Sequence, residues 1–257
     1  MSHVFSPELV ALGEVLIDFT QAGFSASGQA LFERNAGGAP ANVAVQAARL
    51  GMSAQFVGKV GADMHGDFLR RSLQERGVDV SSVAQDPDAF TTLAFVEVDP
   101  RTAERSFSFA RKPGADTRLF PAEVSGQAIR DCHVLHVGSL SLTDEPARAA
   151  TLHAVSIARQ AGALVSYDPN YRASLWPSEH EAVEQMSALL PRADLVKINE
   201  DEALLLCGTG NPEAASQYIL DQGAALVAVT LGSQGAFVAT QAESVLVPTC
   251  PCQPRDA

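Results

Sequence analysis

The sequence has little that would suit an exported, membrane-bound or nucleic-acid-binding protein. It contains only 4 cysteines in 257 residues, with no CxxC spacing, which argues against a disulfide framework or a zinc module. It has 18 lysines and arginines and 30 acidic residues, which gives a formal net charge of −12. No basic surface for nucleic acid or anionic lipid is therefore expected. No apolar run approaches the roughly 18 residues of a membrane span, and Met1 to Glu8 lacks signal-peptide features. We therefore expect a cytoplasmic protein without a nucleic-acid or membrane partner.

The composition indicates a globular protein with a substantial core. Hydrophobic residues make up 46% of the chain, aromatic residues 6% and charged residues 19%. The apolar surface is sufficient to offset the entropy lost on ordering the chain. The length is compatible with one large α/β domain, and no linker marks a boundary. We expect a single domain over residues 1–257.

Strand-like and helix-like segments alternate along the chain. Several strand-like runs are apolar at consecutive positions, as expected of strands covered on both faces. Strands are predicted at Leu9–Ile17, Ser53–Val57, Cys132–Val137, Ala163–Tyr167, Leu195–Ile198 and Ala224–Thr230. Helices are predicted at Ala41–Leu50, Asp63–Arg76, Glu145–Gln160, Ser178–Leu190 and Pro212–Gln222, with Gly51, Gly77 and Gly223 at C-terminal caps. The alternation predicts an α/β fold with a doubly wound, mostly parallel sheet and helices on both faces.

Two stretches break this alternation. Gln29–Arg34 is strand-like, and Thr91–Val98 with Glu104–Ala110 resembles a hairpin around Asp99 to Arg101. A small antiparallel sheet set apart from the main layer would act as a lid over the strand ends. The lid strands are therefore expected within about residues 28–34 and 91–110.

The first candidate site combines a glycine turn with an acid. Gly37 and Gly38 precede a helix whose first turn holds Asn42, an arrangement that lets backbone approach a ligand, although a tight turn feeding a helix explains the glycines equally well. Asp18 follows the apolar run that ends at Ile17, and it is expected at the end of the first strand, where ligands of α/β sheets bind. A carboxylate there suits a polyol, and the alternative is a turn-capping acid.

Two further clusters follow predicted strands. Asp168, Asn170 and Arg172 fall in one loop, which places an acid, an amide and a guanidinium where a polar, partly anionic ligand would bind. Asn199 and Glu202 lie three residues apart at the start of a helix. They suit a helix cap and also a water-mediated magnesium and phosphate site, and these two interpretations are compatible.

Several other chemistries find no support. Gly208 to Gly210 lacks the third glycine of a dinucleotide fingerprint, and the chain has no GxxxxGK loop. It also has no GxSxG nucleophile elbow.

Seven segments together resemble the ribokinase-like (PfkB) family of carbohydrate kinases, and within it the fructokinases and ketodeoxygluconate kinases. They span almost the whole chain in order: GEVLIDF (13–19), GGAPANVA (37–44), GADMHGDFL (61–69), GSLSL (138–142), DPNYRASLW (168–176), KINEDE (197–202) and VTLGSQGA (229–236). The DPNYRASLW segment leans toward fructokinase and weighs against a nucleoside kinase. The resemblance implies a ribokinase-like α/β fold with a β lid and transfer of the ATP γ-phosphate to a sugar hydroxyl.

The resemblance also implies roles for individual residues. The substrate-binding residues it implies are Asp18, Gly37, Gly38, Asn42, Arg111, Asp116, Asn170 and Arg172. The nucleotide-binding residues are Lys197, Asn199, Glu202, Thr230, Gly232 and Gly235. Asn199 and Glu202 would hold Mg²⁺ indirectly, through water, and exposed lid edges would suit a homodimer.

The resemblance ends before a family signature. Family members follow the strand at Val245–Val247 with a DTTGAGD motif, whose last Asp is the general base and whose glycines form the anion hole. In this sequence Asp256 aligns with the first Asp of that motif, and Ala257 is the last residue. We expect a C-terminally truncated kinase that keeps its sugar site and transfers phosphate poorly, with Arg172 the one remaining candidate catalytic group. A non-catalytic sugar-binding or regulatory module is the alternative from another class, and a ketodeoxygluconate or nucleoside kinase is the alternative within the family.

Overall fold

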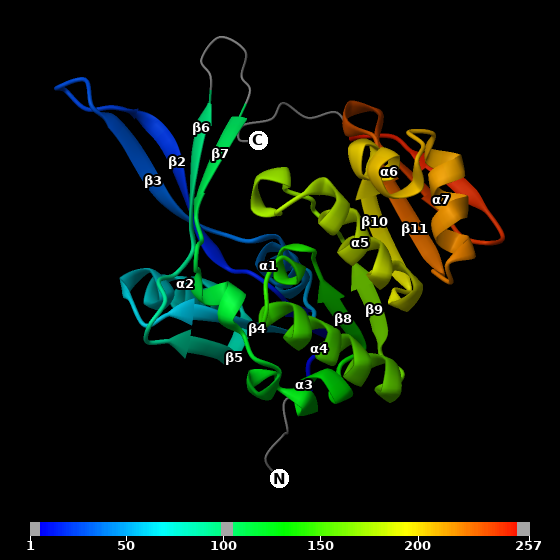
Figure 1. Cartoon of the computed structure of the whole chain (residues 1–257), viewed down its shortest axis with the longest axis horizontal. Coiled ribbons are helices and arrows are strands. Elements are labelled where there is room, and N and C mark those ends of the chain that lie inside the picture. Colours follow the sequence, from blue (N-terminus) through cyan, green and yellow to red (C-terminus); the bar gives the residue numbers. More distant parts are fainter. Residues whose placement is uncertain (1–5, 99–104, 251–257) are drawn as a thin grey trace. The chain divides into compact units, whose positions relative to one another are not determined.

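The computed structural model describes residues 6–98 and 105–250. The chain divides into two compact units, Met1–Ala163 and Leu164–Ala257 (Figure 1). Each unit contains parallel strands with flanking helices. The single-domain assignment stays a prediction, and each unit is described by itself.

The first unit is built on four parallel strands in the order β8-β1-β4-β5. Their bounds are β1 Leu9–Leu12, β4 Ala54–Gly61, β5 Val78–Asp86 and β8 Val134–Val137. The helices of this unit are α1 Ala39–Arg49, α2 Met64–Glu75, α3 Gly126–Asp131 and α4 Ala147–Ala161. Apolar side chains of β1, β4, α1 and α2 share one buried cluster, which includes Ala11, Ala44, Phe56, Leu69 and Leu73. Burial of these side chains holds the two helices against the sheet.

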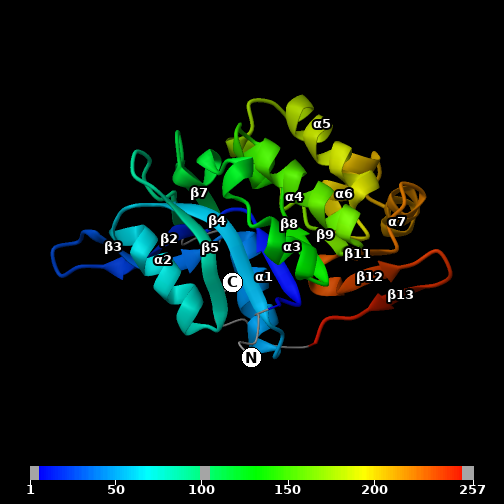
Figure 2. The same cartoon turned by 90° about the horizontal axis from the view of Figure 1, so that it is seen from below.

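A second, smaller sheet belongs to the same unit, as the fold class predicts. It is mixed rather than wholly antiparallel as expected, because β2 and β6 pair in parallel. Its order is β3-β2-β6-β7, with bounds β2 Leu16–Phe24, β3 Ala30–Gly37, β6 Leu93–Val98 and β7 Arg105–Ala110. β2 and β3 run side by side and project beyond the rest of the unit (Figures 1 and 2). The connection between β6 and β7 lies outside the described residues.

The prediction of one strand over Leu9–Ile17 is wrong. The chain leaves the main sheet after β1, and β2 begins at Leu16 in the small sheet. The break falls at Gly13, which has φ 154° and packs against the ring of Pro40. A Cβ at Gly13 would lie 2.6 Å from Pro40 Cγ. Asp18 therefore lies inside β2, opposite Asn35 of β3, rather than at the end of the first strand.

The second unit carries the strand order β13-β12-β11-β10-β9. β9 Leu164–Tyr167, β10 Leu195–Asn199 and β11 Leu226–Thr230 are parallel, whereas β12 Ala236–Ala239 and β13 Ser244–Val247 are antiparallel. Its helices are α5 Glu179–Leu189, α6 Glu200–Cys207 and α7 Pro212–Asp221. The predicted strand at Val245–Val247 is thereby confirmed.

Helix ends follow the predicted signals. Gly51, Gly77 and Gly223 come directly after the C-caps of α1, α2 and α7, each with positive φ. Asp63 caps α2 by accepting hydrogen bonds from the backbone N–H groups of His65 and Gly66. No helix within residues 6–98 and 105–250 is long and apolar enough to cross a membrane.

Candidate active site

The turn from β3 into α1 brings together Asp18, Gly37 and Gly38. A Cβ at Gly37 would collide with the carboxylate of Asp18, and a Cβ at Gly38 would collide with the carbonyl oxygen of Glu14. Gly38 also has φ 107°, a conformation that L side chains rarely adopt. Only glycine therefore allows the backbone at residue 37 to pack against the Asp18 carboxylate. This contact places a hydrogen-bond acceptor, the carboxylate, beside the start of α1.

Gly37 and Asn42 line a common cavity of about 220 Å³ in the first unit. Asn42 is exposed on the first turns of α1, where its backbone N–H donates to the carbonyl of Gly38 at 2.9 Å. The cavity continues along α1 and α2; its other lining residues are Val15, Ala36, Ala41, Val45, Arg49, Ser72, Leu73 and Arg76. An amide, two guanidinium groups and a hydroxyl make this a polar cavity suited to a hydroxyl-bearing ligand.

Arg111 and Asp116 form a buried ion pair. Nε and Nη2 of Arg111 each lie 2.8 Å from Asp116 Oδ2. The same guanidinium donates to Thr143 Oγ1 at 2.9 Å and to the carbonyl of Leu140 at 2.8 Å. Thr92 donates to the other oxygen of Asp116. The pair therefore ties Thr92, directly before β6, to the short helix η1 (Ala115–Arg118) and to η3 (Leu140–Leu142). Its predicted contact with substrate stays a prediction.

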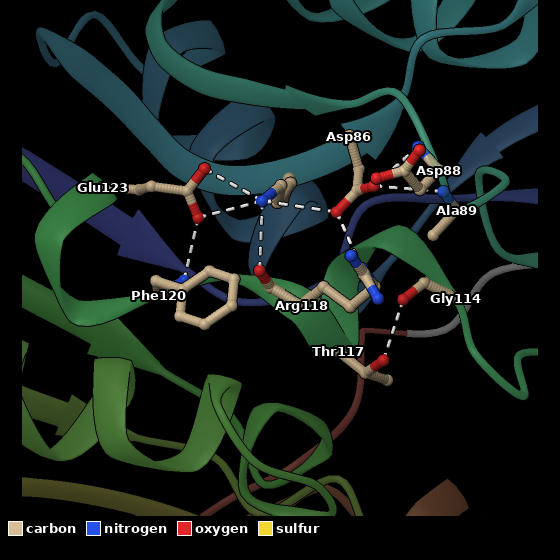
Figure 3. Close-up of polar contacts among 9 residues, drawn as sticks. Asp86, Asp88, Ala89, Gly114, Thr117, Arg118, Phe120 and Glu123 are labelled. Carbon is tan, nitrogen blue, oxygen red and sulfur yellow. Dashed lines mark hydrogen bonds and ion pairs between the residues drawn. The ribbon is translucent and has the colours of Figure 1, made fainter.

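A second charge cluster anchors the other end of η1 (Figure 3). Lys59 of β4 lies 3.3 Å from Asp86 and 2.9 Å from Glu123, and Arg118 Nε donates to Asp86 at 2.9 Å. Burial alone would raise the pKa of Asp86, but hydrogen bonds from Arg118, the Asp88 amide and Lys59 hold it at about 2. The sequence reasoning did not single out this cluster, because its partners lie far apart in the chain.

In the second unit the Asp168–Arg172 loop is held by side chains from β10 and α6. Asp168 pairs with Lys197 at 3.2 Å and accepts the backbone N–H of Asn170 at 3.2 Å. Asn170 has φ 45°, an uncommon value for a residue other than glycine. Arg172 donates to the carbonyl of Tyr171 at 2.9 Å. The loop thus presents Asn170 and Arg172 from a fixed backbone.

Asn199 and Glu202 form a capping box at the start of α6. Asn199 Oδ1 accepts the Glu202 N–H at 2.8 Å, and Glu202 Oε2 accepts the Asn199 N–H at 2.9 Å. The other oxygen of Glu202 accepts the Tyr171 N–H at 2.8 Å, which connects the helix to the preceding loop. Burial raises the pKa of Glu202, against these hydrogen bonds. The predicted helix cap is confirmed.

Thr230 lies opposite Asn199, since the two residues are register partners at the carboxyl ends of β11 and β10. Thr230 Oγ1 donates to the carbonyl of Ile198 at 3.3 Å. Gly232 begins the short helix η6 (Gly232–Gln234) and Gly235 follows it, with φ 54° and 111°. The structure therefore groups the predicted nucleotide-binding residues of β10, α6 and β11 at one edge of this unit's sheet. Within the described residues no group of three or more His, Cys, Asp or Glu side chains could hold a metal ion.

Comparison with known proteins identifies this arrangement. A model of the pfkB family carbohydrate kinases matches residues 6–256. The chain belongs to this family. The resemblance read from the seven sequence segments is confirmed.

Several of the similar proteins are fructokinases. Fructokinase-1 of Oryza sativa subsp. japonica is 45% identical over 230 residues, which cover 88% of this chain and 71% of that protein. Fructokinase-1 of Zea mays is 44% identical, with the same coverage. The crystal structure of fructokinase from Xylella fastidiosa superimposes with a TM-score of 0.88 at 36% identity, over 95% of this chain and 76% of that chain. This member of the pfkB family is therefore a fructokinase-like sugar kinase, which transfers phosphate to a sugar, and its α/β fold with a large, mostly parallel sheet is confirmed.

Proposed function

We propose that this kinase takes fructose as its phosphate acceptor. The hydroxyls of fructose are held by residues of β2, of the turn into α1 and of α1 itself: Asp18, Gly37, Gly38 and Asn42. The observation that carries the proposal is the close contact between the Asp18 carboxylate and the backbone at Gly37. A carboxylate accepts hydrogen bonds from sugar hydroxyls, and the Asn42 amide both donates and accepts. A double mutant of fructokinase from Vibrio cholerae O395, described in a fructose, ADP and potassium ion bound form, superimposes with a TM-score of 0.87 at 32% identity, over 98% of this chain and 79% of that chain.

Arg111 and Asp116 stand beside the sugar in this proposal and act mainly by orienting the segments that surround it. Their donors and acceptors are already committed to each other and to Thr92, Leu140 and Thr143. A substrate would meet a guanidinium whose position is fixed in advance, which reduces the entropy lost on binding.

ATP is the proposed phosphate donor, bound by the second unit. The residues we assign to it are Lys197, Asn199, Glu202, Thr230, Gly232 and Gly235. Asn170 and Arg172 are assigned to the sugar or the transferred phosphate, where the Arg172 guanidinium would stabilise negative charge. A fructokinase from Xylella fastidiosa, described with bound ATP, superimposes with a TM-score of 0.88 at 36% identity, over 96% of this chain and 76% of that chain.

Mg²⁺ is the proposed ion, held indirectly by Asn199 and Glu202. Their oxygens are the hard donors that Mg²⁺ prefers, but those of the capping box already accept backbone N–H groups. The residues therefore fit an ion held through its water shell. Bound there, Mg²⁺ would neutralise charge on the phosphates.

Calorimetric titration with fructose tests the sugar site. Asp18→Ala and Asn42→Ala are each expected to weaken fructose binding about ten-fold or more, since each removes a hydroxyl partner. Gln46→Ala, one turn further along α1 and outside the cavity lining, is the matched control. Unchanged affinity in both site variants would exclude this assignment.

Parallel assays on the same preparation separate the competing functions. ADP release with MgATP and fructose indicates a kinase, whereas fructose binding without ADP release indicates a sugar-binding module. Tighter binding of ketodeoxygluconate, or of a nucleoside, would assign the substrate to another branch of the family.

The small sheet is the proposed dimer interface, with a second copy of the chain as partner. Among its exposed apolar side chains are Phe24, Leu31, Phe32, Phe95 and Phe107. Phe95 stacks on Phe19 with ring centroids 5.3 Å apart and meets Phe32 edge-on at 6.1 Å. Light scattering after size exclusion is expected to show a dimer that Phe95→Glu dissociates. Phe90→Glu, at an exposed site outside this sheet, is expected to leave it intact.

A further inference from the structure

Glu14 is a buried carboxyl that the sequence reasoning did not assign. It follows Gly13 in the segment between β1 and β2, and only 2% of its surface is exposed. Its Oε1 accepts the backbone N–H of Ala39, the first residue of α1, at 3.0 Å. Its Oε2 has no hydrogen-bond partner among the described residues. A buried carboxyl with one uncommitted oxygen is costly, so its presence at this position calls for a physical explanation.

The contacts of Glu14 converge on the glycine turn. Gly38 occupies the N-cap position of α1 and has no side chain with which to bond the free N–H groups of the first turn. The Glu14 side chain supplies that acceptor from another segment. The Glu14 carbonyl also lies so close to Gly38 that a Cβ there would collide with it. Both the side chain and the backbone of Glu14 therefore fix where the turn lies.

The charged groups that face Glu14 are those of the Arg111–Asp116 pair. Burial raises the pKa of Glu14 from 4.5 to about 7, against lowering contributions from nearby backbone N–H groups and from Arg111, while Asp116 adds to the rise. Protonation near neutral pH thus changes the charge beneath the turn.

We propose that Glu14 is a positioning residue for the sugar site, which fixes the Gly37–Gly38 turn and the start of α1 through its bond to Ala39. This inference rests on the proposed function, because it concerns the geometry of the same fructose site. Ionised Glu14 makes the stronger, charge-assisted bond to the Ala39 N–H. The bond to Ala39 is strongest when Glu14 is ionised, although burying the charge costs stability of the whole fold, and fructose binds most tightly in that state.

The test compares Glu14→Gln and Glu14→Ala with the unchanged chain by calorimetric titration of fructose from pH 5.5 to 8.5. Glu14→Ala loses the acceptor for Ala39 and is expected to weaken binding about ten-fold or more. In the unchanged chain, fructose affinity is expected to fall about three-fold as the pH drops through neutrality, in line with the weaker neutral bond. Glu14→Gln keeps an acceptor without a charge, so its affinity is expected to be nearly independent of pH.

Glu8→Ala is the matched control. Glu8 also accepts a backbone N–H, that of Ser53 at 2.8 Å, but at the other end of β1. It is expected to lower stability and to leave fructose affinity within about two-fold of that of the unchanged chain. Circular dichroism confirms that each variant is folded. Unchanged affinity in folded Glu14→Ala, or the same pH profile in the unchanged chain and in Glu14→Gln, would overturn the proposal.

A second readout does not depend on fructose. The backbone amide resonance of Ala39 in the nitrogen-15 spectrum is expected to titrate near neutral pH in the unchanged chain and not in Glu14→Gln. If the chain binds no fructose at any pH, the proposed function fails, whereas an Ala39 resonance that ignores Glu14 contradicts the positioning role itself.

Discussion

At the scale of single residues, Glu14 links stability to pH. Its pKa in the folded chain is about 7, above the ordinary 4.5, so the native state holds this proton more firmly than the unfolded state. Stability is therefore lost as pH rises from 4.5 to 7, on the order of 3 kcal/mol for this group. Glu14→Gln is expected to remove this dependence. In urea denaturation, the unfolding free energy of the variant should therefore rise relative to that of the unchanged chain between pH 5 and pH 8. Parallel stability curves for the two proteins would contradict the assignment.

The backbone geometry at Gly38 limits which residue types this position tolerates. Gly38→Ala introduces a Cβ against the Glu14 carbonyl at φ 107°, and we expect a loss of about 2 kcal/mol or more in unfolding free energy. Gly28→Ala is the comparison, because Gly28 also has positive φ, 78°, but lies in open space. Its expected cost is about 1 kcal/mol. Equal losses in chemical denaturation would show that the contact with Glu14 adds nothing.

At the scale of elements, two helices of the second unit begin with an Asn cap. Asn199 bonds the N–H of Glu202 at the start of α6, and Asn211 bonds that of Ala214 at the start of α7 at 3.0 Å. Asn199→Ala and Asn211→Ala are each expected to lose about 1 kcal/mol of stability. Only Asn199→Ala is expected to weaken ATP binding, as measured by titration with MgATP. Equal nucleotide affinity in the two variants would remove Asn199 from the nucleotide site.

The Lys59–Asp86–Arg118 cluster joins β4, β5 and η1 through ion pairs. Asp86→Asn leaves Lys59 with Glu123 as its remaining acidic partner, and we expect a loss of about 3 kcal/mol. Because the pKa of Asp86 is depressed to about 2, its contribution is present above pH 4 and is lost as pH falls toward 2. Acid denaturation should accordingly be less steep in the variant. Asp88→Asn, an exposed neighbour, is expected to behave like the unchanged chain.

At the scale of the whole molecule, the net charge of −12 opposes association of two copies. Salt screens this repulsion over about 10 Å at 0.1 M, whereas apolar contact through the small sheet is not weakened by it. The proposed dimer is therefore expected to tighten between low and moderate salt near pH 8. Sedimentation at several protein concentrations measures this, and a dimer that weakens with salt would point to an interface of opposite charges.

The amino-acid sequence by itself determined the α/β class, the helix ends, the glycine turn and the family, because these depend on local periodicity, backbone conformation and motifs of a few residues. The tertiary structure alone decided where the chain leaves β1 for the small sheet, since an apolar run does not reveal which sheet it joins. It also decided the partners of Glu14, Arg111 and Lys59. Those partners lie up to 64 residues away in the chain, and only long-range packing selects one acceptor among many.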